Sequence, residues 1–89
     1  MSTAIVIELI SASVCNRCSI AKKQLRNLVE ELDNDRIQYR EIDVLEEFDY
    51  VVSLAVLRTP SIVIDGKLIF TGMPSSKRLK VELQKRLAI

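Results

Sequence analysis

In this 89-residue chain, the residues whose type and spacing suit a chemical reaction are two cysteines, Cys15 and Cys18. No other cysteine is present. Two thiols three positions apart can close into an intramolecular disulfide and open again, which moves two electrons. Where such a CxxC pair stands between a strand and a helix, it is typical of a redox-active dithiol. The pair therefore predicts thiol–disulfide exchange.

The flanking residues predict the elements that hold the pair. Residues 5–10 are β-branched and almost continuously apolar, as in a strand buried on both faces. After Cys18, apolar residues recur at mostly three- and four-residue intervals up to a turn at residues 33–35. These residues are Ile20, Leu25, Leu28, Val29 and Leu32. Cys15 is thus expected at or near the N-cap of a helix.

This position predicts different roles for the two thiols. The first N–H groups of a helix lack intrahelical partners and carry partial positive charge, so they favour a thiolate at Cys15. Cys18 lies one helical turn further in, where packing shields it, and this suits a resolving thiol. Arg17 stands between them. Its charge either adds to the stabilisation of the thiolate or is simply solvated.

Two other uses of the cysteines stay open at this point. A purely structural disulfide is disfavoured because the loop that it closes is too small to constrain the unfolded chain much. A zinc site needs four ligands, and the chain has no histidine and no third cysteine. Two chains could still pool their cysteines around zinc or an iron–sulfur cluster.

Composition narrows the class of protein. At 89 residues and 48% hydrophobic content, residues 1–89 are expected to form one compact domain. Thirteen basic and twelve acidic side chains give a net charge of +1, which argues against nucleic-acid binding. No apolar run approaches the length of a membrane span, and no basic leader precedes an apolar segment. We therefore expect a cytoplasmic protein without membrane partners, where a dithiol is catalytic rather than structural.

The middle of the chain predicts a second strand and a second helix. Residues 36–44 alternate imperfectly between polar and apolar side chains, which favours a strand. Residues 46–58 are rich in apolar side chains at helical spacing, with Asp43 or the residues just after it as a possible cap. Pro60 is expected to end this helix, because the residue before a proline is biased away from helical backbone angles.

The C-terminal third predicts a hairpin and a last helix. Residues 61–64 and 67–70 are β-rich and are separated by Asp65-Gly66, the signature of a type I′ turn. Gly72 and Pro74 break the pattern after the second of these strands. Ser75 or Ser76 then caps a helix with a stripe of leucines. The stripe consists of Leu79, Leu83 and Leu87.

The predicted order is β-α-β-α-β-β-α, an α/β fold with a four-stranded mixed sheet and helices on both faces. Alternation of strands and helices implies right-handed parallel crossovers, and the hairpin adds one antiparallel edge strand. The strands at residues 5–10 and 61–64 are the most continuously apolar and are expected at the centre.

The chain resembles the thioredoxin superfamily over essentially its whole length. The resemblance rests on CxxC after the first strand and on the block Thr59-Pro60-Ser61-Ile62-Val63-Ile64-Asp65-Gly66-Lys67, followed by Phe70-Thr71-Gly72-Met73-Pro74. It is greatest to glutaredoxins and to the small thioredoxin-like proteins of archaea and bacteria. The resemblance implies a single thioredoxin-like domain over residues 1–89.

The same resemblance implies an activity and a set of site residues. The activity is thiol–disulfide exchange, with Cys15 as attacking thiolate and Cys18 as resolving thiol. Pro60 would be the cis-proline facing them, and the backbone of Thr59 would bind an extended substrate segment. Val14, Gly72 and Met73 would frame the groove. The partners would be disulfide-containing proteins and, as electron donor, a reductase or a low-molecular-weight thiol, with no cofactor and the protein as a monomer.

Several positions depart from the superfamily's patterns. Asn16 and Arg17 occupy the middle of the CxxC, and no tryptophan precedes Cys15. Ala12 stands where glutathione-binding glutaredoxins have a lysine, and Met73-Pro74-Ser75 replaces their acidic pair. We therefore expect weak use of glutathione. Glu8 is assigned no proton-transfer role. The alternative function is a carrier in which Cys15 of two chains shares an iron–sulfur cluster or metal, as some glutaredoxins do.

Overall fold

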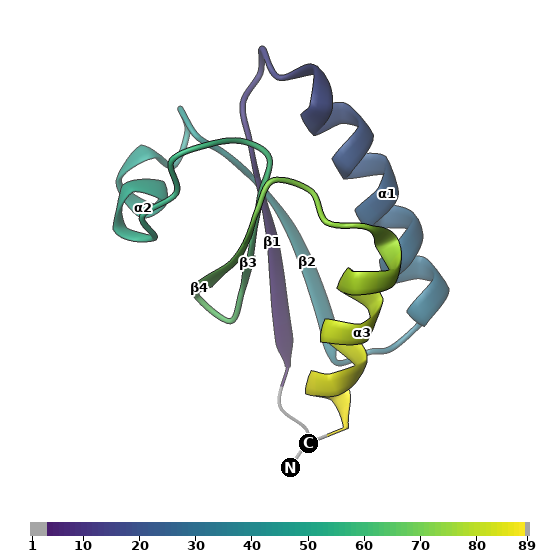
Figure 1. Cartoon of the computed structure of the whole chain (residues 1–89). Coiled ribbons are helices and arrows are strands. Elements are labelled where there is room, and N and C mark those ends of the chain that lie inside the picture. Colours follow the sequence, from purple (N-terminus) through teal and green to yellow (C-terminus); the bar gives the residue numbers. More distant parts are fainter. Residues whose placement is uncertain (1–3, 89) are drawn as a thin grey trace.

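The computed structural model describes residues 4–88, which form a four-stranded sheet with three helices (Figure 1). The strand order is β2-β1-β3-β4. The strands are β1 (Ile5–Ser11), β2 (Ile37–Asp43), β3 (Ser61–Ile64) and β4 (Lys67–Thr71). The helices are α1 (Asn16–Leu32), α2 (Phe48–Ser53) and α3 (Ser76–Leu87). None of these helices is both long and apolar enough to cross a bilayer.

The helices cover both faces of the sheet, as expected (Figure 1). On one face, α1 and α3 pack against β1 and β3 through Leu25, Leu79 and Leu83, all fully buried. On the other face, Val51 of α2 packs over Ile10 and its neighbours in the sheet. β1 and β3 occupy the centre and β3 is buried throughout, so the prediction from their continuous apolar sequence is confirmed.

The direction of β3 differs from the prediction. β1 and β2 are parallel, but β3 runs antiparallel to β1, so the expected second parallel crossover is wrong. The ends explain this: Asp43 pairs with Ser11 and Ser61 pairs with Ile10, so β2 leaves and β3 enters at the same edge of the sheet. A parallel strand would begin at the opposite end of β2, about 23 Å away, and α2, which spans about 9 Å, does not carry the chain there.

The second helix is shorter than its apolar pattern predicts. It ends at Ser53, well before Pro60, and Ala55 has a positive φ of 60° that takes the chain off the helical path. The chain must turn back to the sheet edge to enter β3, and this outweighs the helical spacing of the apolar residues. Asp43 does not cap α2, because its carboxylate accepts the N–H groups of Leu45 and Glu46 instead.

The local turn and cap predictions are confirmed at three places. Asp65 and Gly66 both have positive φ, 51° and 79°, as a type I′ turn requires. Ser75 is the N-cap of α3, and its hydroxyl accepts the N–H of Arg78 at 3.2 Å. Asp33 ends α1 in the left-handed conformation. One residue was misplaced: Ile20 is 61% exposed, because Cys18 and Ala21 take the buried side of the first turns.

Candidate active site

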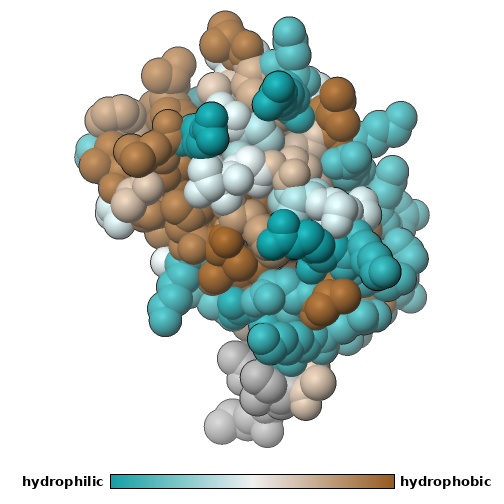
Figure 2. Space-filling model, viewed as in Figure 1, coloured by the Kyte–Doolittle hydropathy of each residue, from teal (hydrophilic) through white to brown (hydrophobic). Residues whose placement is uncertain are grey.

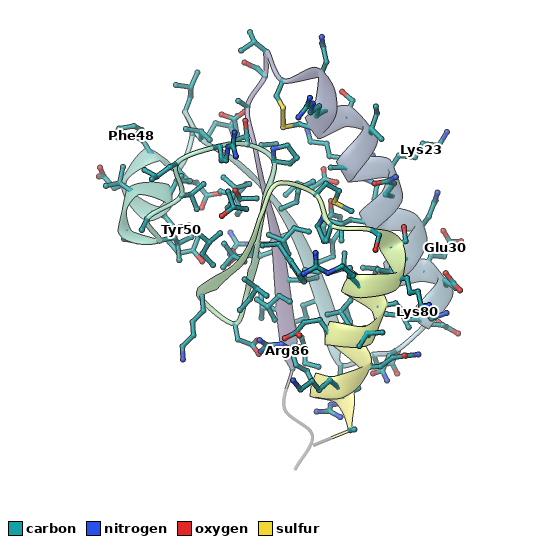
Figure 3. All side chains as sticks on the ribbon, in the orientation of Figure 1. Lys23, Glu30, Phe48, Tyr50, Lys80 and Arg86 are labelled. Carbon is teal, nitrogen blue, oxygen red and sulfur yellow. A yellow bond between two sulfur atoms is a disulfide. The ribbon has the colours of Figure 1, made fainter. Side chains whose placement is uncertain are left out.

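Cys15 is the N-cap residue of α1, as predicted, and forms a disulfide with Cys18. The Sγ of Cys15 accepts the backbone N–H of Cys18 at 3.2 Å, and the two Cα atoms are 5.3 Å apart. Figure 3 shows the disulfide at the end of the molecule where α1 begins. A sulfur in this position receives both a hydrogen bond and the positive end of the helix dipole. Both interactions favour a negative charge on Cys15 when the bond is reduced.

The two sulfurs differ in access to solvent. Cys15 is half-buried, and the loop residue before it, Val14, is 93% exposed. Cys18 is only 2% exposed, since it lies on the face of α1 that packs against the sheet. A large reactant can therefore reach the sulfur of Cys15 more easily than that of Cys18.

The segment that enters β3 lies at the same edge of the sheet. Its Thr59–Pro60 peptide bond is cis, and Pro60 is buried. The carbonyl of Pro60 accepts the N–H of Gly72 at 2.8 Å, which ties the segment before β3 to the segment after β4. Gly72 has a φ of 85°, a backbone conformation that residues with a Cβ rarely adopt. The two segments are thus fixed relative to each other.

Two shallow hollows open on either side of the cysteine loop, residues 12–15, which joins β1 to α1. The first has a volume of about 240 Å³ and joins the end of β1 to the segment before Pro60. Its lining is Ala12, Val44, Val51, Val56, Leu57, Arg58 and Thr59. The second, about 280 Å³, lies between the first turns of α1 and the segment after Gly72. Its lining is Arg17, Ile20, Ala21, Gln24, Met73, Pro74 and Ser75.

A buried carboxylate lies under α2. Glu8 is 2% exposed, accepts the hydroxyl of Tyr50 and binds Arg40 at 3.0 Å. The hydrogen bond to Glu8, together with burial, raises the pKa of Tyr50 to about 12. Figure 3 shows Tyr50 on the side of α2 toward the sheet, whereas Phe48 points outward. The bond from Tyr50 therefore anchors α2, and with it the segment that leads to Thr59, whereas the bond from Arg40 joins β2 to β1.

No group of three or more His, Cys, Asp or Glu side chains within residues 4–88 is arranged to hold a metal ion. The pair Cys15–Cys18 is instead joined sulfur to sulfur. None of the features described here favours the alternative of a shared iron–sulfur cluster.

Comparison with known proteins identifies the family. The thioredoxin domain family matches residues 5–84, which contain the cysteine pair and the Thr59-Pro60 segment. The chain belongs to the thioredoxin family. A thioredoxin of Methanocaldococcus jannaschii is 30% identical over 81 residues, 91% of this chain and 94% of that protein.

Solved structures agree with the thioredoxin fold. Thioredoxin-2 of a malaria parasite superposes with a TM-score of 0.81 at 18% identity, covering 96% of this chain and 85% of that one. Oxidised mitochondrial thioredoxin 3 of Saccharomyces cerevisiae gives 0.77 at 21% identity, covering 93% of this chain and 79% of that one. With the family and the CxxC pair together, this thioredoxin-family protein is a thiol–disulfide oxidoreductase. Proteins of this family act on disulfides and are served by a reductase.

The structure places the predicted site residues of this thioredoxin-family protein in small groups. Arg17 and Met73 line one hollow, Thr59 lines the other, and Gly72 is hydrogen-bonded to Pro60. Val14 lines neither hollow and projects beside Cys15.

Sequence reasoning missed several lining residues of this thioredoxin-family site. Leu57, 94% exposed, lines the first hollow and Ile20 the second, whereas the sequence pattern predicts the second helix for Leu57 and the core for Ile20. Their common signal is an apolar residue two positions from a predicted site residue, Thr59 or Cys18, but helical spacing gave each of them another explanation. Gln24 and Ser75 carry no such signal, because only the packing of α1 beside the β4–α3 connection brings them to the hollow.

Proposed function

We propose that this protein reduces disulfides in other proteins, with Cys15 as the attacking thiolate and Cys18 as the resolving thiol. The observation that carries the proposal is the asymmetry of the pair. Cys15 is accessible at the start of α1 with its Sγ accepting an N–H, and Cys18 is buried one turn further on. Such surroundings lower the pKa of an accessible thiol and shield its neighbour.

The reaction consists of two exchanges. The Cys15 thiolate attacks one sulfur of the substrate disulfide, the substrate S–S bond breaks, and the sulfur that leaves takes up a proton. Cys18 then loses its proton and attacks the Sγ of Cys15, which releases the second substrate sulfur as a thiol. Two electrons pass from the dithiol to the substrate. The product is the Cys15–Cys18 disulfide that the structure contains.

The substrate segment is proposed to bind across the edge of the sheet. The backbone of Thr59 would pair with it as an added strand does, and buried Pro60 would support this segment from behind. Val14, Arg17, Gly72 and Met73 would frame it. Support comes from the two hollows, which bring Thr59 on one side and Arg17 with Met73 on the other to the cysteine loop.

The cycle needs an electron donor, and we propose a dedicated reductase or a dithiol in preference to glutathione. Ala12 and Met73-Pro74-Ser75 leave the site without the lysine and the acidic pair that glutaredoxins use for the tripeptide. We further propose that the chain works as a single domain and a monomer in the cytoplasm, with no nucleic-acid or membrane partner.

Trapping of the mixed disulfide tests the proposed roles. Cys18→Ser should accumulate a covalent complex with a disulfide-containing protein such as insulin, because the second exchange cannot occur. Cys15→Ser should form no complex and show no turnover. Full activity of Cys18→Ser on insulin would contradict the two-cysteine cycle and require a one-cysteine mechanism.

A further inference from the structure

The segments that line the two hollows beside the cysteines contain few carboxylates. The twelve acidic residues leave three long stretches empty, residues 9–29, 50–64 and 66–81. These stretches supply every residue that lines the two hollows except Val44. Asp43, next to Val44, has its carboxylate engaged by the N–H groups of Leu45 and Glu46. Asp43 keeps its negative charge in these bonds, but within residues 4–88 it forms no ion pair with an arginine of either hollow.

One arginine lies in each hollow, Arg58 in the first and Arg17 in the second. Both are exposed, and neither forms an ion pair with a carboxylate among residues 4–88. Three of the other five arginines, Arg26, Arg40 and Arg86, each bind a carboxylate. The two guanidinium groups that flank the cysteine pair thus keep their donors for a ligand.

The hollows themselves are mostly apolar. Val51, Val56 and Leu57 line the first, and Ile20, Met73 and Pro74 line the second. Figure 2 shows apolar surface gathered over α2 and the segment that follows it. Each hollow therefore offers a place for an apolar side chain with a fixed positive charge at its lining.

We propose that this site selects disulfides held in acidic, extended protein segments, in which the reacting cysteine is flanked on both sides by apolar residues and carboxylates. This inference rests on the proposed function and names its substrate class. Carboxylates would pair with Arg17 and Arg58, while the apolar neighbours occupy the hollows. A basic segment would meet two like charges that form no ion pair within the described residues, so it binds more slowly.

The test uses three peptides with the same disulfide loop and the same apolar neighbours. The positions beyond these neighbours carry Asp, Asn or Lys. The measurement is the second-order rate constant for oxidation of the fully reduced protein by each peptide, divided by the rate constant of dithiothreitol with that peptide. The division removes the intrinsic reactivity of each disulfide. In about 20 mM salt the acidic peptide should react roughly fivefold faster than the neutral one, with the basic peptide slowest, and 0.5 M salt should reduce these ratios.

Variants that remove one positive charge test whether Arg17 and Arg58 cause the preference for the acidic peptide. Arg17→Gln and Arg58→Gln should each lower the ratio of acidic to basic rates, and this ratio does not depend on the reactivity of Cys15, which all peptides share. Lys67→Gln is the matched control, because it removes the same charge at the hairpin, at the other end of β3 from Pro60. Its ratio should equal that of the wild type.

The possible results separate the inference from the proposed function. Equal normalised rates for the three peptides would overturn the acidic preference and leave the reductase activity intact. A preference unchanged in Arg17→Gln and Arg58→Gln would also overturn it. Failure of all three peptides to oxidise the protein would instead contradict the proposed function.

Discussion

Cys15 and Cys18 are the same type of residue, and their surroundings give them different chemistry. Cys15 ends the loop before α1 and accepts an N–H, whereas Cys18 is enclosed between α1 and the sheet. The residue type and the spacing made this division predictable from the sequence. The arrangement around Glu8 was not predictable, because Tyr50 and Arg40 are 42 and 32 positions away from it and meet it only in the folded chain.

Tyr50→Phe should lower the free energy of unfolding by about 1–3 kcal/mol, since it leaves a buried carboxylate without one of its donors. Denaturation by urea measures the loss. Tyr39→Phe is the matched control: its hydroxyl also donates to a carboxylate, that of Glu41, but at a half-exposed site. The control should lose clearly less stability. Equal losses in the two variants would contradict the anchoring role of Glu8.

Glu41 forms a surface cluster with Arg26 and Tyr39, and its pKa determines how the stability of this cluster changes in acid. Burial raises the pKa of Glu41, but hydrogen bonds from Arg26 and Tyr39 outweigh this and hold it below the ordinary 4.5. A lowered folded-state pKa contributes stability above pH 4.5, and this contribution is lost as the pH falls through the folded-state value. The difference in unfolding free energy between wild type and Glu41→Gln should therefore shrink below pH 4.5. A difference that grows in acid would contradict this sign.

At the scale of elements, the strands, the hairpin and the start of α1 followed from local sequence, while the region between β2 and β3 did not. The apolar residues from Phe48 to Leu57 have helical spacing, yet the helix stops at Ser53. The deciding constraint is tertiary: β3 must begin at the edge where β2 ends. That same departure from the helix lets Leu57 and Arg58 line the first hollow, so the error in the fold and the missed role of Leu57 have one cause.

Gly72 and Gly66 are two glycines with similar backbone conformations, but only Gly72 is hydrogen-bonded to a predicted site residue, Pro60. Both have positive φ, 85° and 79°, and in both cases an added Cβ would meet no atom within 4 Å. Alanine at either position should cost about 1–2 kcal/mol of stability, because only the backbone conformation is strained. Gly72→Ala should also slow insulin reduction, since Gly72 is hydrogen-bonded to Pro60. An equal loss of activity in Gly66→Ala would remove the specific role of this contact.

At the scale of the whole molecule, the acidic residues cluster along the chain. Nine of the twelve lie between Glu30 and Asp49, whereas residues 9–29, which contain the disulfide, and residues 50–64, which contain Thr59 and Pro60, have none. The sequence alone shows this clustering, but it does not show that Arg17 and Arg58 line hollows on opposite sides of the cysteine loop. The sheet makes this juxtaposition by bringing the ends of β1 and β3 to one edge.

The central claim is that Cys15 is the reactive thiolate and Cys18 the shielded one. Its most direct test is alkylation of the reduced protein with iodoacetamide over a range of pH, with each cysteine followed separately by peptide mass spectrometry. Cys15 should react with a midpoint well below about 8.5, the pKa of a free thiol, and roughly tenfold or more faster than Cys18 at pH 7. Equal rates at the two cysteines, or a midpoint for Cys15 at the value of a free thiol, would contradict the account.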